Sequence, residues 1–120
     1  MATLTPTLTL TSSNALSDNL SITFTDSLTV TDPVEIAKVT ATTSNSPTLV
    51  ASTDSDTYYV YLKNTDGANF VSVKDGGGTN IFMKLHAGEF CFFTLAPSEG
   101  LILDADTGNC IVEYGIFKKG

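Results

Sequence analysis

The sequence predicts an all-β fold, an antiparallel β-sandwich of the jelly-roll type, and three observations lead to it. Before Tyr58, apolar residues alternate with Ser or Thr, which is the period-two pattern of a strand with one covered face. Clusters of turn-forming residues recur about every 8 to 12 residues. No stretch keeps a helical period long enough for an amphipathic helix, and 120 residues suffice for one domain with a core.

The strands of the first half are predicted from this alternation. Residues 20–25 and 28–31 repeat the apolar-Thr pattern, and Asp26-Ser27 is expected to form a turn between them. Asp32-Pro33 is expected to end the second of these strands, because proline has no N–H to donate to a ladder. Residues 34–43 are compatible with a short helix, but their density of β-branched residues favours a strand.

Residues 1–14 are expected to form an N-terminal arm or edge strand, followed by a single sandwich domain over residues 15–120. Pro6 disfavours a regular central strand. Leu8 and Leu10 fall on one face with Thr on the other, which suits a strand that docks on a neighbouring molecule. The alternative is an ordinary first strand of the same sandwich, and the sequence leaves both open.

The second half gives stronger strand signals, rich in aromatic and β-branched residues. Asp66-Gly67 predicts a short hairpin, and Gly76-Gly77-Gly78 predicts a turn in which positive φ is available. Glu89, after Gly88, is expected to accept backbone N–H bonds within a tight turn. The expected strands span residues 58–63, 69–74, 80–85, 89–95, 101–103 and 110–117.

Strand 89–95 carries apolar side chains on both faces, and strand 110–117 nearly does. A two-layer sandwich covers only one face of each sheet, so either the Thr-rich first half or another subunit must cover the second face. Tyr59 and Tyr61 share a face with each other but not with Tyr58, which favours core or interface roles over a sugar-stacking platform. The expected interface residues are Leu8, Leu10, Tyr59, Tyr61, Phe90, Phe92, Phe93 and Phe117.

Charge and composition exclude several function classes. Six Lys and no Arg face 13 acidic residues, and the net charge of -7 disfavours nucleic acid and anionic membranes as partners. One His, no Arg and no Trp leave few groups for acid-base chemistry, so we expect no enzymatic activity and no cofactor. The N-terminus has neither a basic start nor an apolar run, so no export signal is expected.

No metal site is expected either. Asp104 and Asp106 resemble the start of a calcium loop, but the sixth and twelfth positions hold Asn109 and Gly115 in place of the required Gly and Glu. A plain turn is the favoured interpretation.

Cys91 and Cys110 lie in apolar stretches and are expected to be free thiols. A disulfide between them stays open if their strands are neighbours.

Three phrases in the second half carry a family resemblance: Leu62-Lys63-Asn64 at a strand end, Gly88-Glu89 in a turn, and Val112-Glu113-Tyr114 in the last strand. Over Tyr58 to Gly120 the chain resembles small β-sandwich virion proteins of tailed bacteriophages, of the head decoration, cement or head-fibre type. The resemblance implies a non-enzymatic virion component assembled in the host cytoplasm, and above all a capsid decoration protein.

The resemblance also implies partners: copies of the chain itself, with a trimer preferred, and the major capsid protein or another virion protein. The alternatives are a tail or fibre accessory protein and a carbohydrate-binding β-sandwich module.

Overall fold

The structure, a computed structural model, describes residues 1–31 and 35–120; the side chains at 32–34 lie outside the description. The described chain forms strands and no helix, so it contains no helix able to span a membrane. The eleven strands are β1 (Ala2–Leu4), β2 (Thr7–Ser12), β3 (Leu20–Thr25), β4 (Leu28–Ala41), β5 (Thr48–Val50), β6 (Tyr58–Asn64), β7 (Val71–Lys74), β8 (Ile81–Leu85), β9 (Phe90–Leu95), β10 (Leu101–Ala105) and β11 (Cys110–Lys119).

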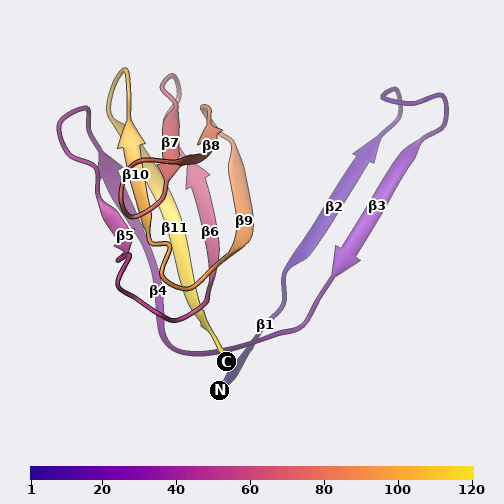
Figure 1. The fold of residues 1–120 in the computed structure, drawn as a ribbon. Coiled ribbons are helices and arrows are strands. Elements are labelled where there is room, and N and C mark those ends of the chain that lie inside the picture. The colour runs from indigo at the N-terminus through magenta and orange to yellow at the C-terminus, as the bar shows by residue number, and fades with distance from the viewer.

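Two antiparallel sheets form a jelly roll, which confirms the predicted fold class. One sheet has the order β1-β4-β11-β6-β9 and the other β5-β10-β7-β8, and they face each other as two layers (Figure 1). From β4 onward the chain alternates between the two sheets, except that β7 and β8 follow each other within the second sheet, as in a doubled Greek key. Residues 28–57 supply β4 and β5, so the first half of the chain contributes to both layers.

The core lies between the two sheets and is built from alternate residues of each strand. On β6, Val60 and Leu62 are fully buried, and on β10, Leu101 and Leu103 are. Period-two alternation therefore places one row of each strand inside, as the sequence pattern predicts. Tyr58 also points inward, and its hydroxyl donates a hydrogen bond of 2.7 Å to Asp54 Oδ2.

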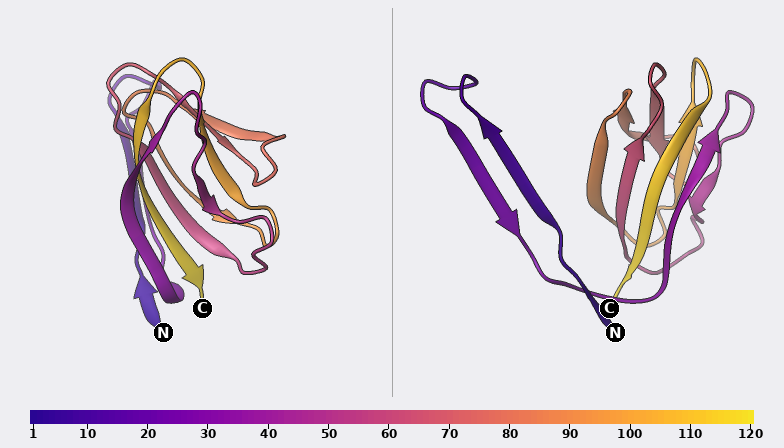
Figure 2. Two further views of the ribbon diagram at one scale, coloured as in Figure 1. Left: turned by 90° about the vertical axis from the view of Figure 1, so that its left-hand side faces the viewer. Right: turned by 180° about the vertical axis from the view of Figure 1, so that it is seen from behind.

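β2 and β3 form a separate hairpin, which we call the arm, Thr7 to Thr25. They pair with each other alone, and the arm stands away from the jelly roll, joined to it at the end where both termini lie (Figures 1 and 2). The radius of gyration is 15.6 Å, against about 13.6 Å expected for a compact chain of this length. The projecting arm accounts for that excess.

The arm continues a ladder that begins in the jelly roll. β1 pairs with the start of β4, Leu4 opposite Leu28, and β2 pairs with β3 in the same register, Thr7 opposite Thr25. Between them the Asp26 N–H donates to the Pro6 carbonyl at 3.2 Å. Pro6 has no N–H to return the bond, so the ladder is weakest where the arm leaves the sheet.

Three local expectations differ from the structure. Asp26-Ser27 lies opposite the Pro6 break, and the chain runs on from β3 into β4 instead of turning back. The strand end predicted at Asp32-Pro33 falls on residues outside the description, and β4 is a single strand from Leu28 to Ala41. β6 and β7 lie in different sheets, so the Asp66-Gly67 segment crosses between layers and forms no hairpin.

The crossing segment is held by the buried side chain of Asn64. Its Nδ2 donates to the carbonyls of Asn69 at 2.8 Å and Leu85 at 3.0 Å, and its Oδ1 accepts the Asp66 N–H at 3.0 Å. These bonds satisfy the amide inside the core, where an unpaired polar group would be costly. The predicted turn residues thus serve an inter-sheet connection.

The projecting segment also differs from the expected 1–14 arm. β1 belongs to the jelly-roll sheet, and the arm runs on to Thr25. Because an isolated strand leaves its backbone groups unpaired, the arm includes β3 as the partner of β2.

Candidate functional site

The outer face of the five-stranded sheet is unusually apolar. The register places Ile36, Gly115, Tyr61 and Phe92 in one row across β4, β11, β6 and β9. The row nearer the arm's base holds Phe117, Tyr59 and Thr94. The outward faces of antiparallel sheets are commonly polar, so an apolar outward face indicates a site of contact with another surface.

Two phenylalanines dominate the exposed part of this face. Phe90 is 61 % exposed and Phe92 is 40 % exposed. The Phe92 ring stacks on the Tyr59 ring, with centroids 6.3 Å apart and planes 19° apart. The stack joins an aromatic residue of β6 to one of β9. β9 is the edge strand of this sheet, on the side toward the arm (Figure 1).

The Phe117 ring covers Gly115 in the middle of the same face. A side chain there would meet Phe117, since a Cβ on Gly115 would lie 2.9 Å from Phe117 Cε2. The Phe117 ring therefore lies across the glycine.

The arm presents an apolar face of its own. In the β2–β3 register Leu8 lies opposite Phe24 and Leu10 opposite Ile22, so the four side chains share one face, whereas the other face is Thr and Ser. Phe24 is 59 % exposed and Leu10 is 45 % exposed. The apolar side of a two-stranded sheet thus has no cover.

The arm and the sheet enclose an open groove of about 720 Å³. Leu8 and Phe24 line it from the arm, whereas Leu10 and Ile22 lie beyond it. Among its described lining residues Asp26 is the one with a charge. The lining residues are Leu4, Pro6, Thr7, Leu8, Phe24, Asp26, Leu28, Ile36, Tyr59, Tyr61, Phe90, Phe92, Thr94, Gly115 and Phe117.

Polar groups border the aromatic face at its far end. Glu113 lies between Lys38 and Lys63 in the register. Its Oε1 accepts a 2.9 Å hydrogen bond from the Tyr61 hydroxyl. Burial and this bond raise the pKa of Tyr61. Glu113 therefore lies on the outer face between two lysines and in contact with a tyrosine.

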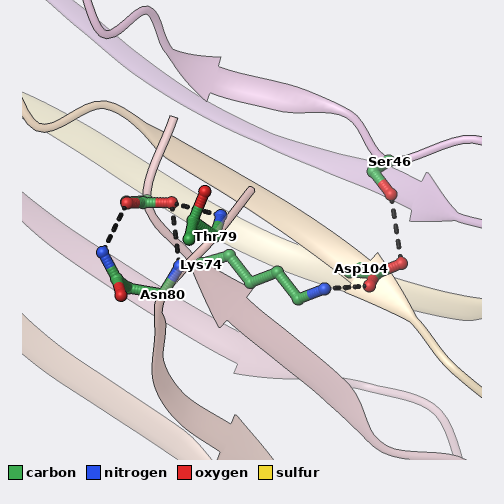
Figure 3. A network of polar contacts seen from close by, with 6 residues as sticks. Ser46, Lys74, Thr79, Asn80 and Asp104 are labelled. Atoms are coloured by element: carbon green, nitrogen blue, oxygen red, sulfur yellow. Dashed lines mark hydrogen bonds and ion pairs between the residues drawn. The ribbon is translucent and has the colours of Figure 1, made fainter. Parts of the chain in front are cut away.

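In the candidate calcium loop, Asp104 is engaged by other contacts. Asp104 pairs with Lys74 Nζ at 2.5 Å and accepts a 3.1 Å hydrogen bond from the Ser46 hydroxyl (Figure 3). The bond from Lys74 lowers the pKa of Asp104. Across the described part of the chain no group of three potential ligands gathers to hold a metal.

The Gly88-Glu89 turn forms as predicted. Glu89 Oε1 accepts the His86 N–H at 2.6 Å, which lowers the pKa of Glu89, and Gly88 adopts φ +80°. The lone histidine is thereby part of a turn.

Both cysteines are free, Cys110 buried and Cys91 half-buried, and burial raises the pKa of Cys91 to about 11.

The structure places seven of the eight expected interface residues on the two facing surfaces. Leu8 and Leu10 lie on the arm, and Tyr59, Tyr61, Phe90, Phe92 and Phe117 lie on the sheet. Phe93 is the exception: it points inward and packs against the core, because its neighbours in the strand point outward.

Sequence reasoning missed Ile22, Phe24, Ile36 and Gly115. Ile22 and Phe24 alternate with Thr as Leu8 and Leu10 do, so their pattern could have found them. Nothing local in the sequence marks Ile36 or Gly115, because their place depends on the pairing of β4 with β11.

Comparisons with known proteins add little beyond the fold. The chain matches no protein-family model and no curated protein. Among solved structures it is similar to a chain described under the words "Bacillus endospore appendages form a novel family of disulfide-linked pili", with a TM-score of 0.49 and 18 % identity, over 78 % of this chain and 91 % of that chain.

This comparison corrects the expected function. The similar solved chain belongs to a bacterial endospore appendage and not to a phage particle, so the prediction of a tailed-phage capsid decoration protein is wrong. The tail-accessory and carbohydrate-binding alternatives receive no support from it. The β-sandwich architecture, which is the coarser part of the expectation, stands on the structure itself.

Proposed function

We propose that the protein is a non-catalytic structural subunit that associates with copies of itself through its exposed apolar surfaces. The observation that carries this proposal is the open groove, with an uncovered apolar face on the arm and another on the sheet. Exposed apolar faces contribute nothing to the stability of a monomer. Contiguous exposed apolar surface is characteristic of protein interaction sites.

Charge supports the same proposal. A chain with net charge -7 repels its own copies, so self-association requires surfaces on which acidic groups stay apart. From Thr7 to Thr25 the arm carries one charged residue, Asp18, at its tip. Among the described residues that line the groove, Asp26 alone carries a charge, and copies can therefore meet there with little burial of charge.

The mass in solution tests the proposal. Light scattering over a micromolar concentration series is expected to give a multiple of 12.7 kDa. Phe92→Ser shifts the protein toward the monomer, because it removes an exposed aromatic residue from the face. Ile81→Ser is the matched control, since Ile81 is a 52 % exposed apolar residue on the other sheet.

A mass of 12.7 kDa at every concentration would contradict the proposal. So would equal loss of association in both variants, because the effect would then follow apolar exposure in general and not this face. The trimeric state expected from the family resemblance stays a prediction, and the same measurement decides it.

A further inference from the structure

We infer that the arm of one copy docks, by its apolar face, on the outer face of β11, β6 and β9 in a second copy. This inference rests on the proposed function and names its mode of association. The occupant of the groove is a hairpin of this same chain.

The first argument is the reach of the arm. Leu8 and Phe24 line the groove, but Leu10 and Ile22, the outer half of the apolar face, do not. Within one molecule, the five-stranded sheet thus lies opposite only that half of the arm's apolar face which is nearer the base of the arm. A second molecule is needed to cover the outer half, which leads on to Leu16, 60 % exposed, at the tip.

The second argument is the match of length. β2 and β3 have six residues each, and β6 and β9 have seven and six. At about 3.3 Å per residue, both surfaces extend for roughly 20 Å. An arm laid along β6 therefore covers nearly the whole strand.

The third argument is the placement of charge. The aromatic face ends in a row in which Lys38 and Lys63 flank Glu113, so the row has a net positive charge, and the arm ends in a tip with Asp18. An arm that lies with its tip toward the Asn64 end of β6 brings Asp18 to these lysines. The neutral surfaces then meet in the centre, and the opposite charges meet at the solvated rim.

The fourth argument is the hinge. The ladder keeps one register through the break, so a change in the arm's angle to the sheet would not require the hairpin to unpair. At the step between β1 and β2, the Asp26 N–H donates to the Pro6 carbonyl, and Pro6 has no N–H to return the bond. A hinged element with an exposed face suits exchange between identical chains, which costs little because both copies offer the same surface.

Photo-crosslinking with isotope-mixed chains tests the inference. The full chain carries p-benzoylphenylalanine in place of Leu10, on the apolar face, and the matched control carries it in place of Thr9, on the opposite face of the same strand. Labelled and unlabelled chains are unfolded, mixed, refolded and irradiated. Mixed-isotope crosslinks from position 10 to peptides of β6, β9 or β11, and their loss at position 9, are expected.

The other outcomes overturn the inference in distinguishable ways. Same-isotope crosslinks alone mean that the arm closes on its own sheet. An oligomer with crosslinks between arms, or elsewhere, means that the chain associates by another mode, and the proposed function survives. A monomer at every concentration removes the proposed function itself.

An arm-free variant supplies an independent test. Pro6 and Asp26 are already joined by the hydrogen bond that closes a two-residue hairpin, so Asn-Gly can replace residues 7–25 without disturbing β1 or β4. This variant is expected to be a folded monomer that still binds the full-length chain, because it keeps the receiving face. Association of the variant with itself would overturn the inference.

Single substitutions measure the contact. Leu10→Asp is expected to weaken association by about tenfold or more, as for a residue at the centre of an interface. Thr9→Asp places the same charge on the other face and is expected to leave association within about twofold. Equal weakening in both variants would contradict docking by the apolar face.

Discussion

In the jelly roll, Leu101 and Leu103 alternate along β10 and lie fully buried between two sheets; in the arm, Leu8 and Leu10 alternate in the same way and stay nearly half exposed. Both strands have the same alternating sequence pattern. They differ because a second sheet covers the leucines of β10, whereas no second sheet covers those of the arm. Alternation fixes which face of a strand is apolar. It does not fix which surface covers that face, or in which molecule that surface lies.

Truncation of one leucine in each region gives the largest expected contrast. Leu103→Ala is expected to lower the free energy of unfolding by about 2 to 5 kcal/mol, because it opens a cavity in a close-packed core. Leu10→Ala, measured at the lowest workable concentration, is expected to change it by less than about 0.5 kcal/mol. Urea unfolding followed by circular dichroism measures both, and similar losses would mean that the arm packs on its own core.

A glycine pair extends the contrast to the loops. Gly100 has φ +73°, and a Cβ there would lie 2.7 Å from the Gly76 Cα. Gly100→Ala is therefore expected to cost about 1 to 3 kcal/mol of stability. Gly67→Ala is the control, because a Cβ on Gly67 meets nothing within 4 Å. Thermal unfolding of the two variants measures the difference in stability. Equal melting temperatures would contradict backbone strain at position 100.

Acid is expected to weaken the jelly roll through its loop carboxylates. Backbone N–H groups of Asn69 and Ala68 lower the pKa of Asp66, and hydrogen bonds from Asn80 and its neighbours lower that of Asp75. A lowered folded-state pKa gives stability that is present above the unfolded value of 3.8 and is lost as the pH falls through the folded value.

The check is urea unfolding at neutral pH and near pH 3. The midpoint is expected to drop on acidification, and Asp66→Asn is expected to lower it at neutral pH and to shrink the drop. A variant with the full wild-type pH dependence would contradict this role of Asp66.

Pro6→Ala gives the smallest expected effect and probes the hinge. Alanine restores an N–H opposite the Asp26 carbonyl, and one added ladder bond is worth about 0.5 to 1.5 kcal/mol, confined to the base of the arm. Hydrogen exchange of the β2 and β3 amides is expected to slow, with the β6 and β11 amides unchanged. Faster exchange in the arm would show that proline stiffens the step.

The sequence predicts the jelly roll well because its evidence is local. The alternating rows and the turns at Gly88-Glu89 and Gly76 to Gly78 need only neighbouring residues. The Asp66-Gly67 hairpin failed because the turn signal is the same whether the next strand pairs back or crosses to the other sheet. Partner choice depends on contacts distant in the chain.

The interaction surface was predictable in part for the same reason. Alternate residues of a strand point to opposite faces, so this rule places Tyr59 and Tyr61 of β6 on the same face as Phe90 and Phe92 of β9. The same rule places Phe93 on the inner face. The place of Gly115 opposite Ile36 follows only from the long β4–β11 pairing. That the arm is a hairpin depends on the pairing of β2 with β3, which no single strand signals.

The way the arm is rooted has a mechanical consequence. β3 runs directly into β4, and β4 is paired with β11 along most of its length, with the Gly120 N–H donating to the Thr29 carbonyl at 2.8 Å. A pull on the arm along the strand direction loads these hydrogen bonds together, in shear, because they lie across the strands. Tension therefore spreads over the longest ladder of the molecule and does not unzip it bond by bond.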